Sequence, residues 1–143
     1  MTRTVYFDSS ALVPLLIDER STLHCDELWF GADTIISSAL AYVEVRAAIA
    51  QARRQGRIDA AQHRTAIETF ELRWSDVVSI EPRESLLRDA ALLAESQALR
   101  GYDAVHCATA VAAASDDLIA ASGDRDLLRA WSALGLHTVD TSA

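Results

Sequence analysis

The sequence predicts an α/β fold in which a mainly parallel sheet is covered by helices on both faces. Short β-branched and aromatic runs alternate with longer helical segments, an order typical of this class. The helical segments are rich in alanine, which suits close packing of helices on a sheet. With 143 residues, of which 50% are hydrophobic, the chain is long enough to bury the core of one domain. We therefore expect a single three-layer α/β/α domain over residues 1–143.

The first half of the chain begins with a strand. Thr4–Phe7 is a compact β-branched and aromatic run, which favours a strand. Residues 9–17 are predicted to be helical, with serines at the start for a cap and Pro14 in the early turns. The apolar positions of residues 22–30, followed by Gly31, predict a second helix. Further along we expect a strand over residues 34–36, a helix over residues 38–54 that ends before Gly56, and a helix over residues 60–74.

The second half repeats the alternation. Val77–Ile80 is predicted to be a strand, and Pro82 prevents a helix from running on from it. Residues 85–99 have a helical apolar surface, and we expect Gly101 to end this helix. The remaining expected elements are an alanine-rich helix over residues 103–114, a strand over residues 118–121, a helix over residues 126–134 closed by Gly135, and a strand over residues 137–139.

The composition excludes several kinds of site. All 13 basic residues are arginines, so the chain has neither the lysine that a P-loop places on phosphates nor the amine that Schiff-base chemistry needs. Its five glycines form no GxGxxG dinucleotide fingerprint. The net charge of −8 argues against a broad nucleic-acid platform. Residues 41–75, however, carry six arginines against four acids, which either meet phosphates locally or form a solvated helix face.

The cysteines and the charge distribution predict a compartment. Cys25 and Cys107 lack CxxC spacing, so we expect free thiols in a reducing environment. The uncharged stretches are too short for a membrane-spanning helix, and Asp8 interrupts the first apolar run where a secretory signal would lie. A cytoplasmic protein without a membrane span is therefore expected.

Acidic residues fall where an open parallel sheet collects its function, beyond the carboxyl ends of the strands. Asp8 directly follows the first predicted strand, and Asp124 and Asp126 follow the fourth. Glu44 lies in the helix after the second strand, and Asp103 opens the helix that leads into the fourth. Burying a bare carboxylate costs several kcal/mol, so each buried acid needs a compensating charge. With few arginines nearby and no lysine, a divalent cation is the natural one.

Each acid also has a simpler explanation. Asp8, Asp103 and Asp124 all stand at or just before a helix start, where aspartate is a favoured cap. Glu44 has no such role, because it lies inside a helix. An ion pair with Arg46 is unfavourable, since two residues of spacing place Arg46 on the opposite side of the helix.

Four ordered motifs resemble those of PIN-domain nucleases. Tyr6–Val13 is similar to the opening motif and Tyr42–Ala48 to the second. Tyr102–Ala110 resembles the third motif and is the strongest match, and Ser122–Leu128 resembles the fourth. The family usually has threonine where this chain has Ser122, which keeps the hydroxyl. A chain of this length resembles the VapC-type toxins of bacterial toxin–antitoxin pairs.

The resemblance implies an endoribonuclease that depends on Mg²⁺ or Mn²⁺ and acts as a toxin by hydrolysing RNA phosphodiester bonds, which restrains translation and growth. It implies an RNA substrate, a cognate antitoxin protein and a homodimer. The site residues it implies are Asp8 and Asp103 as principal metal ligands, Asp124 completing the site, Glu44 orienting water, and Ser9 and Ser122 supporting the ligands. The fourth motif also offers Asp126: the resemblance favours Asp124 as the acid that faces the metal, with Asp126 as a supporting or capping residue. Separately, the spacing of Arg46 and Arg53 places them on one helix face with Arg57 near its continuation, and we expect this surface to contact RNA phosphates or an antitoxin.

Other functions remain open at this point. A PIN-like module that binds RNA or an antitoxin without cleaving is the main alternative. A receiver domain or a haloacid-dehalogenase-type phosphatase would each need a lysine, which this chain lacks. A DNA nuclease on the same fold usually carries extra helical or basic elements. His106 could be a general base, but a hydrogen-bonded histidine of the helix is the favoured interpretation, because a metal would activate the water.

Overall fold

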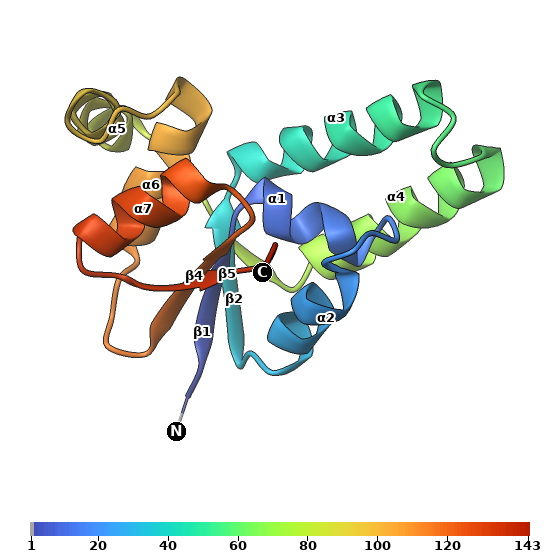
Figure 1. Cartoon of the computed structure of the whole chain (residues 1–143), viewed down its shortest axis with the longest axis horizontal. Coiled ribbons are helices and arrows are strands. Elements are labelled where there is room, and N and C mark those ends of the chain that lie inside the picture. The colour runs from blue at the N-terminus through green and yellow to red at the C-terminus, as the bar shows by residue number, and fades with distance from the viewer. Residues whose placement is uncertain (1) are drawn as a thin grey trace.

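The computed structural model describes residues 2–143 and contains one five-stranded sheet with helices on both faces (Figure 1). All four strand pairings are parallel, in the order β3-β2-β1-β4-β5. The predicted three-layer α/β/α class is therefore confirmed. The strands are β1 (Thr4–Phe7), β2 (Thr34–Ser38), β3 (Val77–Ile80), β4 (Leu118–Ser122) and β5 (His137–Asp140).

The helices also follow the predicted order. Gly56 and Gly135 follow α3 and α7 with positive φ angles of 72° and 88°, the left-handed conformation that ends a helix. The helices are α1 (Ser9–Leu12), α2 (Thr22–Phe30), α3 (Leu40–Arg54), α4 (Ala60–Trp74), α5 (Glu84–Ser96), α6 (Gly101–Ala112) and α7 (Arg125–Ala133), with a 3₁₀ turn η1 (Val13–Leu15) after α1.

Most helix bounds lie within two residues of the prediction, and two helices differ more. The helix expected over residues 9–17 is one α-helical turn followed by η1, because Pro14 has no N–H with which to continue the α-helical ladder. The helix expected over residues 85–99 ends at Ser96, and Gly101 opens α6 instead of ending α5.

Ala98 makes the turn between α5 and α6. Its φ of 54° is left-handed, and the Leu99 N–H reaches back to the Ala94 carbonyl at 3.1 Å. This is the six-to-one hydrogen bond of a Schellman cap, with alanine in the position that usually holds glycine. The cap also buries Leu99, which is 8% exposed.

The sheet separates two apolar clusters. Val5 and Phe7 of β1 face the cluster built with α1, α2, α3 and α4. Tyr6, between them in sequence, faces the cluster built with α5, α6 and α7, because side chains alternate across a strand. Trp131 of α7 is fully buried there and packs edge-on against Tyr6, with ring centroids 5.7 Å apart. The central strand is thus covered on both faces, as its uninterrupted apolar sequence predicts.

The strand order places a topological switch point at the carboxyl end of β1. From β1 the chain first adds β2 and β3 on one side, and later adds β4 and β5 on the other. Such a reversal of strand order opens a crevice between the two central strands, where open α/β sheets bind ligands. The segments that begin or end there are the residues after β1 and β4 and the first turns of α3 and α6.

Both cysteines are free and buried, as expected from the sequence. Burial raises the pKa of the Cys25 and Cys107 thiols to about 11, which keeps them protonated and unreactive at neutral pH. Of the helices in residues 2–143, none is both long enough and apolar enough to cross a membrane.

Candidate active site

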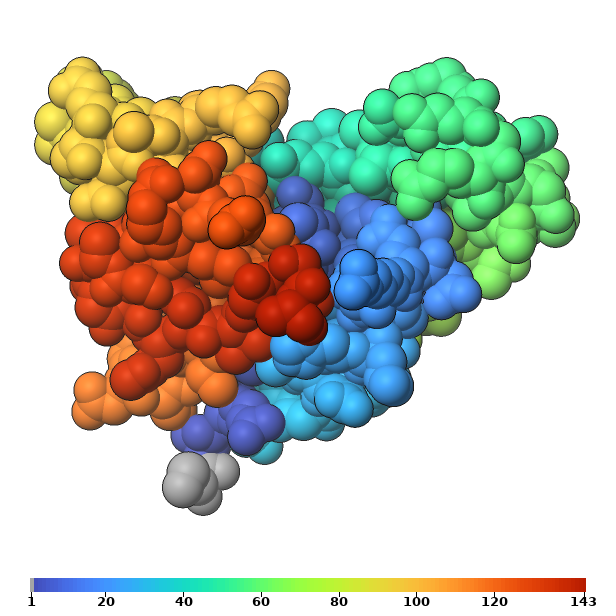
Figure 2. Space-filling model, in the orientation of Figure 1, coloured from blue at the N-terminus to red at the C-terminus, as the bar shows by residue number. Residues whose placement is uncertain are grey.

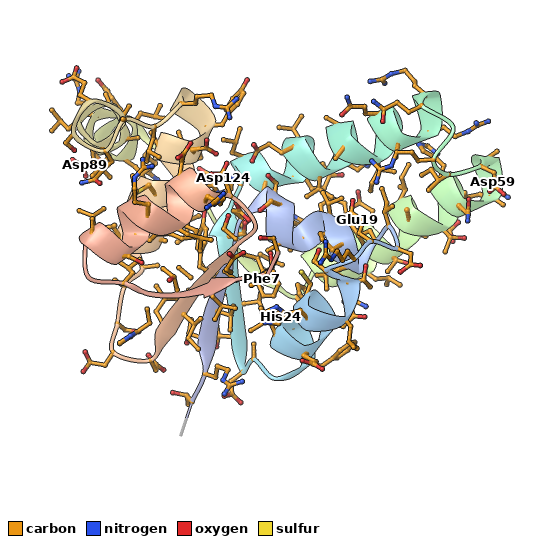
Figure 3. The ribbon with its side chains drawn as sticks, viewed as in Figure 1. Phe7, Glu19, His24, Asp59, Asp89 and Asp124 are labelled. Atoms are coloured by element: carbon orange, nitrogen blue, oxygen red, sulfur yellow. The ribbon has the colours of Figure 1, made fainter. Side chains whose placement is uncertain are left out.

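The candidate site lies at the carboxyl edge of the sheet, around Asp8. In Figure 2 the blue atoms of the N-terminal segment appear between the orange and red atoms of α6 and α7 and the teal atoms of α3. Figure 3 shows Asp124 at this meeting point, whereas Asp59 lies at the far tip of the α3–α4 hairpin and Asp89 lies out on α5. The fold therefore gathers segments that are distant in sequence at one edge.

Asp8 is the most strongly held of the acids. It is 4% exposed and caps α1 through a 3.1 Å hydrogen bond from the Ala11 N–H to Oδ1. Ser10 donates a 2.7 Å hydrogen bond to the same oxygen, and Ser122 donates one of 2.7 Å to Oδ2. Burial raises the pKa of Asp8, while the neighbouring His106 and these hydrogen bonds act in the opposite direction.

The two serines are themselves held by the backbone of the turn after β4. Ser10 Oγ accepts a 2.8 Å hydrogen bond from the Gly123 N–H, and Ser122 Oγ accepts one of 2.9 Å from the Asp124 N–H. A Cβ at Gly123 would stand 3.3 Å from Thr141 Oγ1 and 3.5 Å from Ser10 Oγ. The turn therefore packs closely against the start of α1 and fixes the Asp8 carboxylate from both sides.

Ser122 thus contacts Asp8, as the sequence leads us to expect, but the expectation for Ser9 needs correction. The hydroxyl that reaches Asp8 belongs to Ser10, which is two residues after this N-cap. At that position the first helical turn brings the side chain back beside the cap, whereas Ser9 makes no side-chain hydrogen bond within residues 2–143.

Asp103 has no direct hydrogen-bond or ion-pair partner in residues 2–143. It is half-buried in the first turn of α6. Burial raises the pKa of Asp103, and the negative charges of Asp124 and Asp8 raise it further. The charges of Arg100 and His106 act in the opposite direction. The charges of Asp8 and Asp124 thus both act on Asp103.

The structure distinguishes Asp124 from Asp126. Asp124 caps α7, with Oδ1 accepting hydrogen bonds of 2.9 Å from the Asp126 N–H and 3.1 Å from the Leu127 N–H. Its charge acts on Asp103. Asp126 is exposed and pairs with Arg129 at 2.7 Å. Asp124 is therefore the acid of this motif that lies with Asp8 and Asp103, while Asp126 forms its ion pair on the surface of α7.

Glu44 is held by a histidine from another helix. Its Oε1 lies 2.6 Å from Nε2 of His106, whose Nδ1 lies 2.7 Å from the Tyr6 hydroxyl. Arg46 instead pairs with Glu71 of α4 at 3.0 Å, which confirms that Glu44 and Arg46 point to different sides of α3. Glu44 keeps Oε2 without a hydrogen-bond partner in residues 2–143.

The donor set fits a hard divalent cation. The available atoms are carboxylate oxygens, and within residues 2–143 Asp8, Asp103 and Asp124 form no ion pair with an arginine. In the same residues, no three histidine, cysteine, aspartate or glutamate side chains converge closely enough to form a complete cage. Mg²⁺ needs no such cage, because it keeps several waters and binds one or two carboxylates directly.

Two of the three arginines of the predicted surface form ion pairs in residues 2–143, and the third does not. Arg46 pairs with Glu71, and Arg57 pairs with Glu19 at 3.1 Å. Arg53 is exposed near the end of α3 and forms no ion pair within the described part of the chain, residues 2–143. Its neighbour Arg54, which was not among the residues expected from the sequence, has the same properties.

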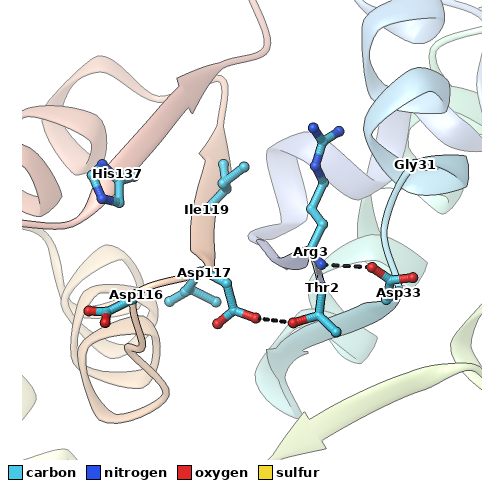
Figure 4. A pocket seen from close by; sticks show the side chains of 9 residues that line it. Thr2, Arg3, Gly31, Asp33, Asp116, Asp117, Ile119 and His137 are labelled. Atoms are coloured by element: carbon cyan, nitrogen blue, oxygen red, sulfur yellow. Dashed lines mark hydrogen bonds between the residues drawn. The ribbon is translucent and has the colours of Figure 1, made fainter.

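A cavity of about 830 Å³ lies at the opposite edge of the sheet (Figure 4). Asp116, Asp117 and Asp33 line it, but two of these acids are used locally. The Arg3 N–H donates a 2.7 Å hydrogen bond to Asp33, and the Thr2 hydroxyl donates one of 2.7 Å to Asp117. The cavity is at the amino ends of the strands, away from the acids around Asp8, so its residues serve as control positions for mutations of the site.

Sequence reasoning missed Tyr6, Ser10 and the partners of His106. The signal for His106 was its place on the apolar, alanine-rich α6, where a buried polar side chain needs partners. Its interpretation as a hydrogen-bonded residue of the helix is confirmed. No local pattern indicated which residues those partners would be.

Comparison with known proteins gives a consistent family. The model of the PIN domain matches residues 5–131. Ribonuclease VapC45 of Mycobacterium tuberculosis (strain CDC 1551 / Oshkosh) is 41% identical over 123 residues, which cover 86% of this chain and 85% of that protein.

Solved structures show the same fold. PAE2754 from Pyrobaculum aerophilum aligns with a TM-score of 0.70 at 24% identity, covering 99% of this chain and 95% of that one. A toxin–antitoxin complex from Klebsiella pneumoniae aligns with a TM-score of 0.66 at 17% identity, covering 96% and 97% of the two chains. With the acids of its four motifs placed around one sheet edge and most of its length matched, this chain belongs to the PIN-domain family.

Proposed function

We propose that this protein is an endoribonuclease that depends on Mg²⁺ or Mn²⁺ and acts as the toxin of a toxin–antitoxin pair. The observation that carries the proposal is the placement of the acids: Asp8 and Asp124 follow two neighbouring strands, Asp103 lies in the first turn of α6, and none of the three is paired with an arginine in residues 2–143. The 41% identity to a protein named Ribonuclease VapC45 supports ribonuclease activity.

Asp8, Asp103 and Asp124 are the residues that would hold the cation. When bound, it would supply charge for the phosphoryl oxygens and acidify a water near neutral pH. Asp8 is held in position by Ser10 and Ser122, so little rearrangement is needed at that carboxylate. Glu44 has one oxygen fixed by His106 and the other available to accept a hydrogen bond from a water.

The test is cleavage of a labelled single-stranded RNA by the purified chain in Mg²⁺, in Mn²⁺ and in EDTA. We expect cleavage with either ion and none in EDTA. Asp103→Asn should reduce the rate by more than about 100-fold, because mutation of a metal ligand costs at least as much as mutation of its supporting residues. Asp116→Asn, which removes one acid at the opposite sheet edge, is the matched control and should cleave like wild type.

Metal binding is measured separately by calorimetry with Mn²⁺. Binding that is lost in Asp8→Asn and Asp103→Asn, but kept in Asp116→Asn, is the expected result. An RNA that binds with unchanged affinity in all variants and is never cleaved would favour the alternative, a binding module without catalysis.

The partner proposed is an antitoxin protein, supported by the similarity of the fold to a chain of a solved toxin–antitoxin complex. Co-expression with a candidate antitoxin should give a complex in which RNA cleavage is inhibited. The homodimer and the cytoplasmic location stay predictions from the sequence; light scattering of the purified chain measures the first, and fractionation of cells measures the second.

A further inference from the structure

We infer that Tyr6 and His106 form a buried hydrogen-bonded pair that positions the Glu44 carboxylate for the RNA-cleaving site. The inference rests on the proposed function for the reaction that Glu44 serves, but the hydrogen-bonded arrangement can be tested without it. His106 would be a positioning residue, since it touches Glu44 and not the site itself.

Three elements supply this arrangement. Tyr6 lies on β1 two residues before Asp8, His106 lies on α6 one turn after Asp103, and Glu44 lies on α3. His106 is 2% exposed, and Tyr6 is fully buried. The distances are 2.7 Å from the Tyr6 hydroxyl to Nδ1 of His106 and 2.6 Å from Nε2 to Oε1 of Glu44. Both ring nitrogens therefore have partners, and each partner comes from a different element.

The chemistry of the partners assigns the protons. A carboxylate only accepts hydrogen bonds, so Nε2 of His106 must carry the proton that it donates to Glu44. A tyrosine phenol carries its proton at neutral pH, so the Tyr6 hydroxyl is available as a donor. The phenol then donates to Nδ1, and both ring nitrogens of His106 have partners in this chain of hydrogen bonds.

This direction of hydrogen bonding has a consequence for Glu44. Its side chain has three rotatable bonds, and Glu44 itself remains partly exposed at 22%. A donor fixed by burial and by Tyr6 holds Oε1 in one place and leaves Oε2 without a hydrogen-bond partner in residues 2–143. Asp103 and His106 are three residues apart and so lie on neighbouring positions of one helix face. A single helix thus presents a proposed metal ligand and the residue that orients Glu44.

The substitutions separate the parts of the pair. Tyr6→Phe removes only the hydroxyl that fixes the imidazole. His106→Leu removes both hydrogen bonds at similar volume, while His106→Gln keeps an N–H donor for Glu44. His137→Leu, at an exposed position on the opposite edge of the sheet, is the matched control.

Single-turnover RNA cleavage under saturating metal reports on the reaction. We expect His106→Leu to slow cleavage by about 10–100-fold, the usual effect of losing a residue that orients a site group, with little change in RNA affinity. His106→Gln should recover most of this loss. In the double variant His106→Leu/Glu44→Gln, the rate should equal that of Glu44→Gln alone, because His106 acts through Glu44. Additive losses, or a His106→Leu rate equal to that of the His137→Leu control, would overturn the inference.

Nitrogen-15 NMR of the imidazole, recorded in EDTA, does not depend on cleavage. We expect the Nε2–H tautomer for His106 in the wild type and a mixture of tautomers in Tyr6→Phe. A wild-type Nδ1–H tautomer would contradict the inference even if His106→Leu failed to fold. If the wild type cleaves no RNA but shows the expected tautomer, the proposed function fails and the hydrogen-bonded pair stands.

Discussion

Ser122 Oγ donates a 2.7 Å hydrogen bond to Asp8 Oδ2 across 114 positions of sequence. The contact joins the end of β4 to the residue after β1, which are neighbouring strands of the sheet. The same hydroxyl accepts a 2.9 Å hydrogen bond from the Asp124 N–H. One small side chain therefore connects two of the proposed metal ligands.

Ser122→Ala should destabilise the fold. It leaves the buried Asp8 Oδ2 and the Asp124 N–H without their partner, and an unsatisfied buried group costs about 1–3 kcal/mol. Urea unfolding at pH 7 in EDTA measures the free energy of unfolding. Ser122→Thr keeps the hydroxyl and should retain more stability than the alanine variant. An alanine variant as stable as wild type would show that the contact contributes nothing.

Asp103→Asn should raise the melting temperature of the metal-free protein at pH 7 by a few degrees. The pKa of Asp103 is higher in the folded state than in the unfolded state. Below the unfolded pKa the protonated carboxyl group therefore makes its full contribution to stability, and this contribution is lost as the pH rises through the folded pKa. At neutral pH the ionised group opposes folding, and the amide removes that cost. The gain should shrink toward about pH 3, where the carboxyl is protonated in both states.

Thermal melts of wild type, Asp103→Asn and Asp116→Asn across this pH range measure the effect. Asp116→Asn should follow wild type, because Asp116 is exposed at the other edge of the sheet. A stabilisation of Asp103→Asn that is the same at all pH values would contradict the electrostatic explanation. Saturating Mn²⁺ should stabilise wild type and reverse the order at pH 7, since a ligand that binds the folded state stabilises it.

The arginines at the end of α3 are predicted to contact RNA phosphates. The double substitution Arg53→Gln/Arg54→Gln should weaken RNA binding and reduce its salt dependence. The slope of log affinity against log salt concentration should become shallower by about 0.7 for each phosphate that an arginine neutralises in the wild type. Arg88→Gln/Arg129→Gln removes the same charge from α5 and α7 and is the control. Equal slopes for the two double variants would remove the α3 end from the RNA-binding surface.

Ala98→Gly should stabilise the protein by about 0.5–1 kcal/mol. Its left-handed φ of 54° costs an L-residue roughly 1–2 kcal/mol, which glycine avoids at the expense of greater freedom in the unfolded chain. Ala91→Gly, at an exposed position within α5, is the opposite control and should lose about 1 kcal/mol. Opposite signs for these two alanine-to-glycine substitutions, measured by urea unfolding, would establish the backbone conformation of the cap.

The sequence alone was enough to predict the order of strands and helices, because that order depends on local signals. β1 and α4 have the predicted bounds, since a β-branched run and a capped apolar period act over a few residues. It also identified Asp8, Glu44, Asp103 and Asp124 as acids expected at the carboxyl edge of the sheet. The exception was local strain: nothing in the pattern around Ala98 predicted a left-handed alanine.

Only the tertiary structure decided which side chains meet. His106 and Glu44 are 62 positions apart, and their contact depends on how α3 and α6 pack at one edge of the sheet. Likewise, Ser9 and Ser10 are adjacent in α1, but only the Ser10 hydroxyl contacts Asp8. Periodicity specifies the face on which a residue lies. Its hydrogen-bond partner depends on strand order and helix position, which are set by packing of the whole chain.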